Sequence, residues 1–440
     1  MRKNLLLAAA ALGMALSSPA MAQTAGEDEA ALNDPVTGRG SIARILSQRD
    51  PFAWHDAIER HTGRARERSL GEAMLALVTE PAGESTAALQ EWLSANASEL
   101  DAGTLIFLSA MYGERLMETG EYQRALSVFR QVSTAIPEAA PNFENGIGIL
   151  EQFGEAGPTR STGASGATVP VTQDNATLLN IPVTINGHTI PMIADTGAEY
   201  SLISHSTAQM LGLESIESSS TIGTSTNEAL EAGFTVVPEI RIGGMEFENV
   251  AFTIIPDEAL QFSAADSDNL DEEYEITGVL GLPVFVAAGR IAWLDNGQQI
   301  ALGSDAPAVS EGGQIYWHRE GLGLEVDFGD GPVPVFFDSG ARVSQTSIRG
   351  LIEVGVDSET LENRTVTTGG GGGFAEENVL VLPSITFGLS GYDFVLEDAS
   401  VYPSEGNPEL ADGGYAGSDI LKRVGLFAID FETMRYRAEE

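Results

Sequence analysis

The chain has 440 residues and a formal net charge of −41, from 64 acidic and 23 basic residues. This charge excludes nucleic acid and anionic membrane surfaces as partners, because their phosphates would be repelled. The absence of cysteine excludes disulfides, thiolate metal sites and thiol catalysis, and a hydrophobic content of 43% excludes global disorder.

Residues 1–22 have the pattern of a bacterial secretory signal. Arg2 and Lys3 form a basic start, residues 5–16 form an apolar core, and residues 20–22 (Ala-Met-Ala) form a cleavage site of small residues. The apolar run is too short to span a membrane, which takes about 18 or more apolar residues, and no later stretch approaches that length. We therefore expect export to the periplasm or secretion, without membrane insertion.

Residues 23–40 are small, polar and acidic, and we expect them to be a flexible segment. Residues 41–157 are rich in Ala, Leu, Glu and Arg, which predicts an all-α helical module. Within it, Gly120, Ala125, Phe129 and Pro137 resemble one tetratricopeptide unit in their spacing. A plain helical hairpin is the alternative. This module is a possible site for a protein partner.

Residues 158–168 are rich in Gly, Ser and Thr and predict a linker. After it, short Val, Ile, Thr and Phe runs separated by Gly, Asn and Pro predict strands. This β part divides into 169–304 and 305–440, and the two halves repeat landmarks in the same order. The landmarks are Asp195-Thr196-Gly197-Ala198 and Asp338-Ser339-Gly340-Ala341, Ser201 and Ser344, Pro238 and Pro383, and Gly281 and Gly417. The repetition indicates an internal duplication.

Each repeated acidic motif follows an apolar strand, which places Asp195 and Asp338 on tight loops at strand ends. A glycine in each loop permits a close approach of two chain segments. If the two loops face each other, the two carboxylates share one proton, and their pKa values separate. Such a pair can hold a water molecule, remove its proton and protonate a substrate carbonyl oxygen.

The two halves resemble retropepsin-like aspartic proteases over roughly residues 170–440, on the two Asp-Thr/Ser-Gly-Ala motifs and on Val279-Leu280-Gly281. The resemblance implies a mostly-β bilobed acid-protease fold with two pseudo-twofold-related lobes. It implies that Asp195 and Asp338 are catalytic. The residues implied to support the pair are Thr196, Gly197, Ser339 and Gly340. It further implies that a peptide or protein substrate binds in the cleft between the lobes of a monomer.

The same resemblance implies a glycine-bearing flap over the cleft in each lobe. The flap candidates are Gly223 in the first lobe and Gly369, Gly370 and Gly371 in the second. Two features depart from the family pattern. Tyr415-Ala416-Gly417 replaces the preferred pair of aliphatic residues before glycine, and Arg342 directly follows the second motif, where a cation near Asp338 would lower its pKa.

The five histidines show no ligand spacing, so we expect no metal ion and no cofactor. The sequence therefore predicts an aspartic-type endopeptidase. One alternative is a non-catalytic protein that binds peptides on the same fold. Another is that each lobe pairs with the same lobe of a second chain.

Overall fold

The computed structural model describes residues 5–7, 51, 54–55, 58, 65–154, 156–174, 176–214, 220–223, 230–262, 274–318, 321–329, 331–370, 373–402 and 412–440. Most of the predicted signal peptide and all of the predicted flexible segment at 23–40 lie outside these residues. The exception is strand β1 (Leu5–Leu7), which pairs in parallel with Thr367–Gly369. Within the described residues, no helix is both long enough and apolar enough to cross a membrane.

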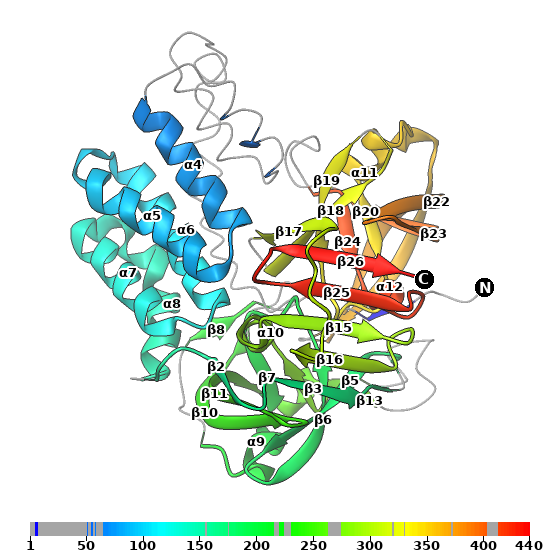
Figure 1. Ribbon diagram of the computed structural model, residues 1–440, viewed down its shortest axis with the longest axis horizontal. Coiled ribbons are helices and arrows are strands. Elements are labelled where there is room, and N and C mark those ends of the chain that lie inside the picture. Colours follow the sequence, from blue (N-terminus) through cyan, green and yellow to red (C-terminus); the bar gives the residue numbers. More distant parts are fainter. Residues whose placement is uncertain are drawn as a thin grey trace.

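A helical region comes first and lies beside the β strands, in blue and cyan in Figure 1. Its elements are α4 (Ala65–Thr79), α5 (Ala82–Asn96), η2 (Ala97–Glu99), α6 (Ala102–Glu118), α7 (Tyr122–Ala135), η3 (Pro137–Ala139) and α8 (Ala140–Gln152). Asp101 caps α6 by accepting a hydrogen bond from Thr104 N over 2.9 Å. Gly113 lets α6 approach α7 closely, because a Cβ there would lie 2.0 Å from Phe129 Cε1. The all-α prediction for this region agrees with the structure.

The first β sheet is built mainly from the first half of the predicted duplication. In sheet order its strands are β10 (Gly233–Ile242), β11 (Met245–Ile255), β7 (Ser201–Ser204), β14 (Gly278–Leu280), β6 (His188–Ala194), β5 (Leu179–Ile185) and β4 (Thr172–Gln173), with β2 (Arg160–Gly163) pairing with β11. Two small hairpins and three helical segments complete this part: β8 (Thr221–Ile222) with β9 (Leu230–Glu231), β12 (Gln261–Phe262) with β13 (Tyr274–Glu275), α9 (His205–Met210), η4 (Asp257–Ala259) and α10 (Leu282–Ala288).

The second sheet has 14 strands and includes β1 at one edge. Its other strands, in chain order, are β3 (Gly166–Pro170), β15 (Arg290–Leu294), β16 (Gln299–Gly303), β17 (Gly313–His318), β18 (Gly321–Asp327), β19 (Pro332–Phe337), β20 (Gln345–Ser347), β21 (Glu362–Gly370), β22 (Gly373–Leu389), β23 (Tyr392–Tyr402), β24 (Gly414–Ala416), β25 (Leu426–Asp430) and β26 (Arg435–Glu439). Its helical segments are α11 (Ile348–Glu353), η6 (Ser358–Thr360) and α12 (Ser418–Leu421).

Backbone pairing links the two halves of the β part. Strand β15, from the first half, pairs antiparallel with β25 over Arg290–Leu294. The segment 158–168, predicted as a linker, contains β2 and the start of β3, which pair with β11 and β16. The small and polar side chains of this segment suggested a flexible connection. Its backbone groups nevertheless form hydrogen bonds along the edges of both sheets.

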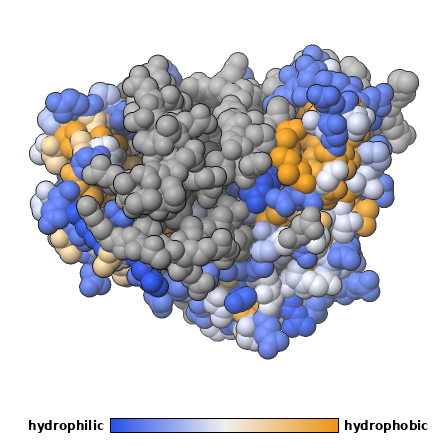
Figure 2. Space-filling view, turned by 90° about the horizontal axis from the view of Figure 1, so that it is seen from above, coloured by the Kyte–Doolittle hydropathy of each residue, from blue (hydrophilic) through white to orange (hydrophobic). Residues whose placement is uncertain are grey.

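The surface in the view of Figure 2 is largely hydrophilic over the described residues, with separate hydrophobic patches. The large hydrophobic side chains that are most exposed among the described residues are Met210, Ile352, Val395 and Tyr415.

Candidate active site

The two acidic residues of the repeated motifs are buried at matching positions. Asp195 directly follows β6 and Asp338 directly follows β19, and their exposed fractions are 0% and 2%. Asp195 N donates to Leu280 O over 3.0 Å, and Asp338 N donates to Ala416 O over 3.0 Å. Each loop is therefore anchored to the short strand, β14 or β24, that runs parallel to the strand before it.

The two loops pack against each other through their glycines. A Cβ on Gly197 would lie 2.8 Å from Asp338 Cγ, and a Cβ on Gly340 would lie 2.4 Å from Asp195 Cγ. No other residue type fits at either position without displacing a carboxylate. The structure thus brings together two acidic residues that are 143 positions apart in the sequence.

The hydroxyl groups of Thr196 and Ser339 join the loops by four hydrogen bonds. Thr196 N donates to Ser339 Oγ over 3.0 Å, and Ser339 N donates to Thr196 Oγ1 over 3.1 Å. Thr196 Oγ1 donates to Phe337 O over 2.9 Å, and Ser339 Oγ donates to Ala194 O over 2.7 Å. Each hydroxyl therefore accepts from one backbone group and donates to another, all of them on the opposite loop or strand.

Backbone amides hold one oxygen of each carboxylate. Gly197 N donates to Asp195 Oδ1 over 2.8 Å. Gly340 N and Ala341 N donate to Asp338 Oδ1 over 2.9 and 3.0 Å. Asp195 Oδ2 is buried without a hydrogen-bond partner among the described residues. Backbone amides thus favour the ionised form at both positions, through Gly197 and Ala198 at Asp195 and through Gly340 and Ala341 at Asp338.

Both carboxyl groups have raised pKa values, mainly because burial disfavours their charged forms. Burial and the neighbouring charge of Asp338 raise the pKa of Asp195 well above its usual range. Burial raises the pKa of Asp338 to about 6, against the lowering effect of its hydrogen bonds to Asp195, Ala341 and Gly340. The two carboxyl groups therefore release their protons separately, and the larger upward shift in pKa is that of Asp195.

A glycine and a serine support each loop from behind. Gly281 N donates to Ser201 Oγ over 3.1 Å, and Gly417 N donates to Ser344 Oγ over 2.8 Å. A Cβ on Gly281 would lie 2.6 Å from Tyr200 C, so the backbone packs directly on the loop. The duplicated spacing of Ser201 and Ser344 was visible in the sequence, but their role as hydroxyl acceptors behind the loops was not.

The second half departs from the first around Arg342. Asp419 accepts hydrogen bonds from Ser344 N and Ser344 Oγ, over 2.9 and 2.6 Å. Burial lowers the pKa of Arg342, and the charge of Asp419 opposes this. Arg342 does not contribute to the shift at Asp338. The cation noted in the sequence therefore interacts with Asp419, an acid that the sequence reasoning missed.

The unusual Tyr415-Ala416-Gly417 segment packs without a defect. Ala416 is fully buried, while Tyr415 is 39% exposed and lies edge-on to Phe336, with ring centroids 5.5 Å apart. Because successive residues of β24 point to opposite faces, the small Ala416 occupies the buried position and the aromatic ring the outer one.

The helical region packs against the loop that carries Asp195. Tyr200, five residues after Asp195, has its ring centroid 5.9 Å from that of Tyr122 and 5.5 Å from that of Phe153. These rings belong to one buried cluster that joins the helices to the first sheet. The helical region also contacts the second sheet, where Cζ of Arg115 lies 4.7 Å from the ring centroid of Trp317 in β17. Arg115 forms an ion pair with buried Glu118.

The predicted flap positions are only partly within the described residues. Gly223 directly follows β8, and residues 224–229 beyond it are outside the description. Gly369 and Gly370 lie in β21, opposite Phe374 and Gly373 of β22. Gly371 lies outside the described residues.

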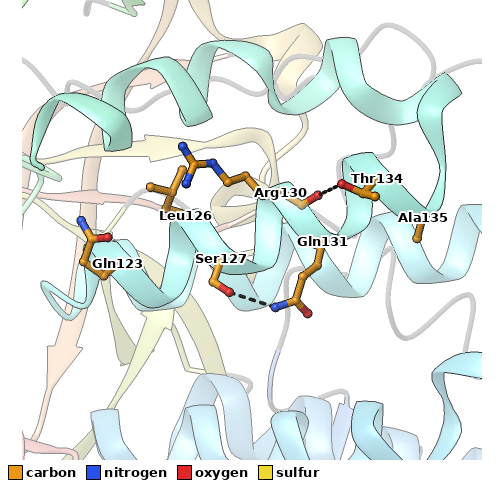
Figure 3. Close-up of a pocket in the computed structure, with 7 residues that line it drawn as sticks. All are labelled: Gln123, Leu126, Ser127, Arg130, Gln131, Thr134 and Ala135. Carbon is orange, nitrogen blue, oxygen red and sulfur yellow. Dashed lines mark hydrogen bonds between the residues drawn. The ribbon is translucent and has the colours of Figure 1, made fainter. Parts of the chain in front are cut away.

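A separate surface hollow lies on α7, far in sequence from both motifs (Figure 3). It has a volume of about 520 Å³ and is lined by Gln123, Leu126, Ser127, Arg130, Gln131, Thr134 and Ala135. Two of its polar side chains form hydrogen bonds within the helix: Gln131 Nε2 donates to Ser127 Oγ over 2.9 Å, and Thr134 Oγ1 donates to Arg130 O over 2.8 Å. Within the described part of the chain, no group of three or more His, Cys, Asp or Glu side chains is placed to hold a metal ion.

Residues 181–284 match the aspartyl protease family. Among solved structures, the chain is similar to the crystal structure of a retropepsin-like aspartic protease from Rickettsia conorii, with 18% sequence identity and a TM-score of 0.21. That similarity covers 33% of this chain and 92% of the other. No curated protein matches the chain. The matched residues include Asp195 and Gly281 of the first half, whereas Asp338 lies outside the match.

Proposed function

We propose that this protein is an exported aspartic endopeptidase in which Asp195 and Asp338 form one catalytic pair between two pseudo-twofold-related lobes of a monomer. The reciprocal hydrogen bonds of Thr196 and Ser339 carry the proposal, because they fix two buried acids face to face. The family match at residues 181–284 supports it for the first lobe.

In the proposed reaction, ionised Asp338 takes a proton from a water molecule bound between the two carboxyl groups. The water oxygen attacks the peptide carbonyl carbon as neutral Asp195 gives its proton to the carbonyl oxygen, which forms a tetrahedral diol. When the carbon–nitrogen bond breaks, Asp338 passes its proton to the leaving nitrogen and Asp195 regains one from a diol hydroxyl. Both groups then return to their starting states.

The pKa directions support this division of roles. Asp195 is the acid whose pKa is raised well above its usual range, by burial and by the neighbouring charge of Asp338. Asp338 receives two backbone amide hydrogen bonds on one oxygen, which favours its ionised form.

The test is hydrolysis of a peptide library by the purified chain, with Asp195→Asn as the inactive variant. Binding of peptides without turnover between pH 3 and 8 would favour the non-catalytic alternative. Sedimentation separates the two modes of lobe pairing, because an active monomer excludes pairing between chains.

A further inference from the structure

The outer edge of strand β8 is occupied by a side chain from the helical region. Asn145 Nδ2, on α8, donates to Thr221 O over 2.8 Å, and Thr221 N donates to Asn145 Oδ1 over 3.0 Å. The amide thus bonds both backbone groups of one residue, as a neighbouring peptide group would in a sheet. Helix α8 and strand β8 lie side by side in Figure 1.

The neighbouring contacts hold the helix close to this strand. A Cβ on Gly148, one turn after Asn145, would lie 2.8 Å from Ser220 Oγ. Ile222 is 2% exposed and belongs to the same buried cluster as Tyr200 and Phe153. The strand is therefore fixed on one side by packing and on its edge by the Asn145 amide.

The two candidate flap hairpins differ in the length over which their own two strands are paired. In the second half, β21 and β22 are paired from Glu362 and Val381 to Gly370 and Gly373. In the first half, β8 and β9 are paired only at Thr221–Glu231 and Ile222–Leu230 within the described residues. Two paired residues make a hairpin that is marginal by itself, so its position depends on outside contacts.

We propose that Asn145 is a positioning residue: it clamps strand β8, which leads into the first candidate flap at Gly223, and so links the helical region to the proposed substrate-binding apparatus. The inference deepens the proposed endopeptidase function and rests on it for the effect on substrate. The clamp itself is a structural claim and is testable without any activity.

The first experiment measures amide hydrogen exchange in the peptides that contain residues 220–223 and 230–232. Asn145→Ala removes both hydrogen bonds, and we expect exchange there at least about tenfold faster than in the parent. Asn96→Ala is the matched control, because its amide bonds Trp92 O inside the helical region over 2.8 Å. Unchanged exchange in Asn145→Ala, or an equal rise throughout the helical region, would overturn the proposal.

Asn145→Asp gives a second and sharper test. An ionised carboxylate can still accept from Thr221 N, but it cannot donate to Thr221 O and it repels that carbonyl oxygen, which weakens the clamp. A neutral carboxyl group has the shape of the amide and can do both. We expect exchange at 220–223, relative to the parent at the same pH, to be fast at pH 7.5 and to return toward the parent value at pH 4. If the exchange rate of the variant at 220–223, divided by that of the parent, is no lower at pH 4 than at pH 7.5, the clamp is contradicted.

Measurements of peptide turnover by the parent and by Asn145→Ala distinguish failure of this inference from failure of the proposed function. We expect Asn145→Ala to raise KM for peptides by about tenfold with kcat and the pH profile little changed, because the acidic pair is untouched. A fall in kcat with unchanged KM would contradict the positioning role. If the parent hydrolyses no peptide, the endopeptidase proposal fails, while the exchange experiment still decides the clamp.

Discussion

Thr196 and Ser339 hold each other's backbone, with N–H to hydroxyl distances of 3.0 and 3.1 Å across the junction of the two acidic loops. Both side chains are fully buried, and each hydroxyl also donates to the strand behind the other loop. The position of one carboxyl group thereby depends directly on the other loop. The predictions below follow from this arrangement and from the burial around it.

Removal of one of these hydroxyls is expected to weaken both folding and catalysis. Thr196→Val removes the acceptor of Ser339 N and the donor to Phe337 O, which costs about 2–4 kcal/mol in the free energy of unfolding. Displacement of the pair is expected to lower kcat by about 10- to 100-fold. Urea unfolding and peptide turnover measure the two effects.

Thr189→Val is the control, since the hydroxyl of this exposed threonine bonds that of Thr184 over 2.8 Å at the surface. A Thr196→Val variant with the stability and rate of the control would show that the four-bond arrangement has no such role.

The pH dependence of kcat/KM is expected to be bell-shaped with its acid limb near pH 6. Asp338 must be ionised to accept a proton, and its pKa is raised to about 6. Asp195 must be protonated, and because its pKa is raised well above the usual range, the basic limb is expected at a higher pH than an ordinary carboxyl group would give. An optimum near pH 4 with loss of activity above pH 5 would contradict these assignments.

The raised pKa of Asp338 also makes a stability prediction. Its folded-state pKa of about 6 exceeds the unfolded value near 3.8, so the folded state binds the proton more tightly. This group therefore favours folding below about pH 4, and its contribution is lost progressively as pH rises to about 6. Above pH 6, ionised Asp338 costs up to about 3 kcal/mol.

Asp338→Asn is accordingly expected to stabilise the protein at pH 7 and to have little effect at pH 3.5. Calorimetry at the two pH values measures this difference. A variant that is less stable than the parent at pH 7 would show that the ionised carboxylate is favoured by its surroundings.

The buried pair of Arg115 and Glu118 is expected to act as a unit. Their exposed fractions are 5% and 3%, and Arg115 also donates to Leu77 O over 3.2 Å. Glu118→Leu leaves the guanidinium buried without its partner and is expected to destabilise by about 3–5 kcal/mol. The double variant Arg115→Met/Glu118→Leu is expected to recover most of this loss.

The exposed pair of Arg66 and Glu99 provides the comparison, at an N–O distance of 2.7 Å. Glu99→Leu is expected to change the free energy of unfolding by less than about 1 kcal/mol. Equal losses at the two sites, or no recovery in the double variant, would argue against a buried unit.

Asp195 and Asp338 could be predicted from the sequence because each lies in the same short motif, which occurs twice. The hydroxyls beside them were part of the same motif. Asn145 and Thr221 gave no such signal, since they are 76 positions apart and meet only through the packing of α8 on the first sheet. The pairing of Asp419 with Ser344 was hidden for the same reason, with 75 positions between them.

The prediction that residues 158–168 form a linker shows a second limit of sequence-based prediction. Gly, Ser and Thr are typical of flexible connections, and sequence patterns report mainly on side chains. Strands β2 and β3 form through backbone hydrogen bonds to β11 and β16, which require few particular side chains at the edge of a sheet. Composition therefore could not reveal that this segment is part of both sheets.

The most direct test of the account is peptide hydrolysis at pH 6.5 by the purified chain and by Asp195→Asn and Asp338→Asn, each assayed separately as a monomer. We predict turnover by the parent and a loss of at least about 1000-fold in kcat in each single variant, because neither acid can act alone. Turnover that persists in either variant, or a parent that binds peptides without cleaving them, would contradict the shared catalytic pair.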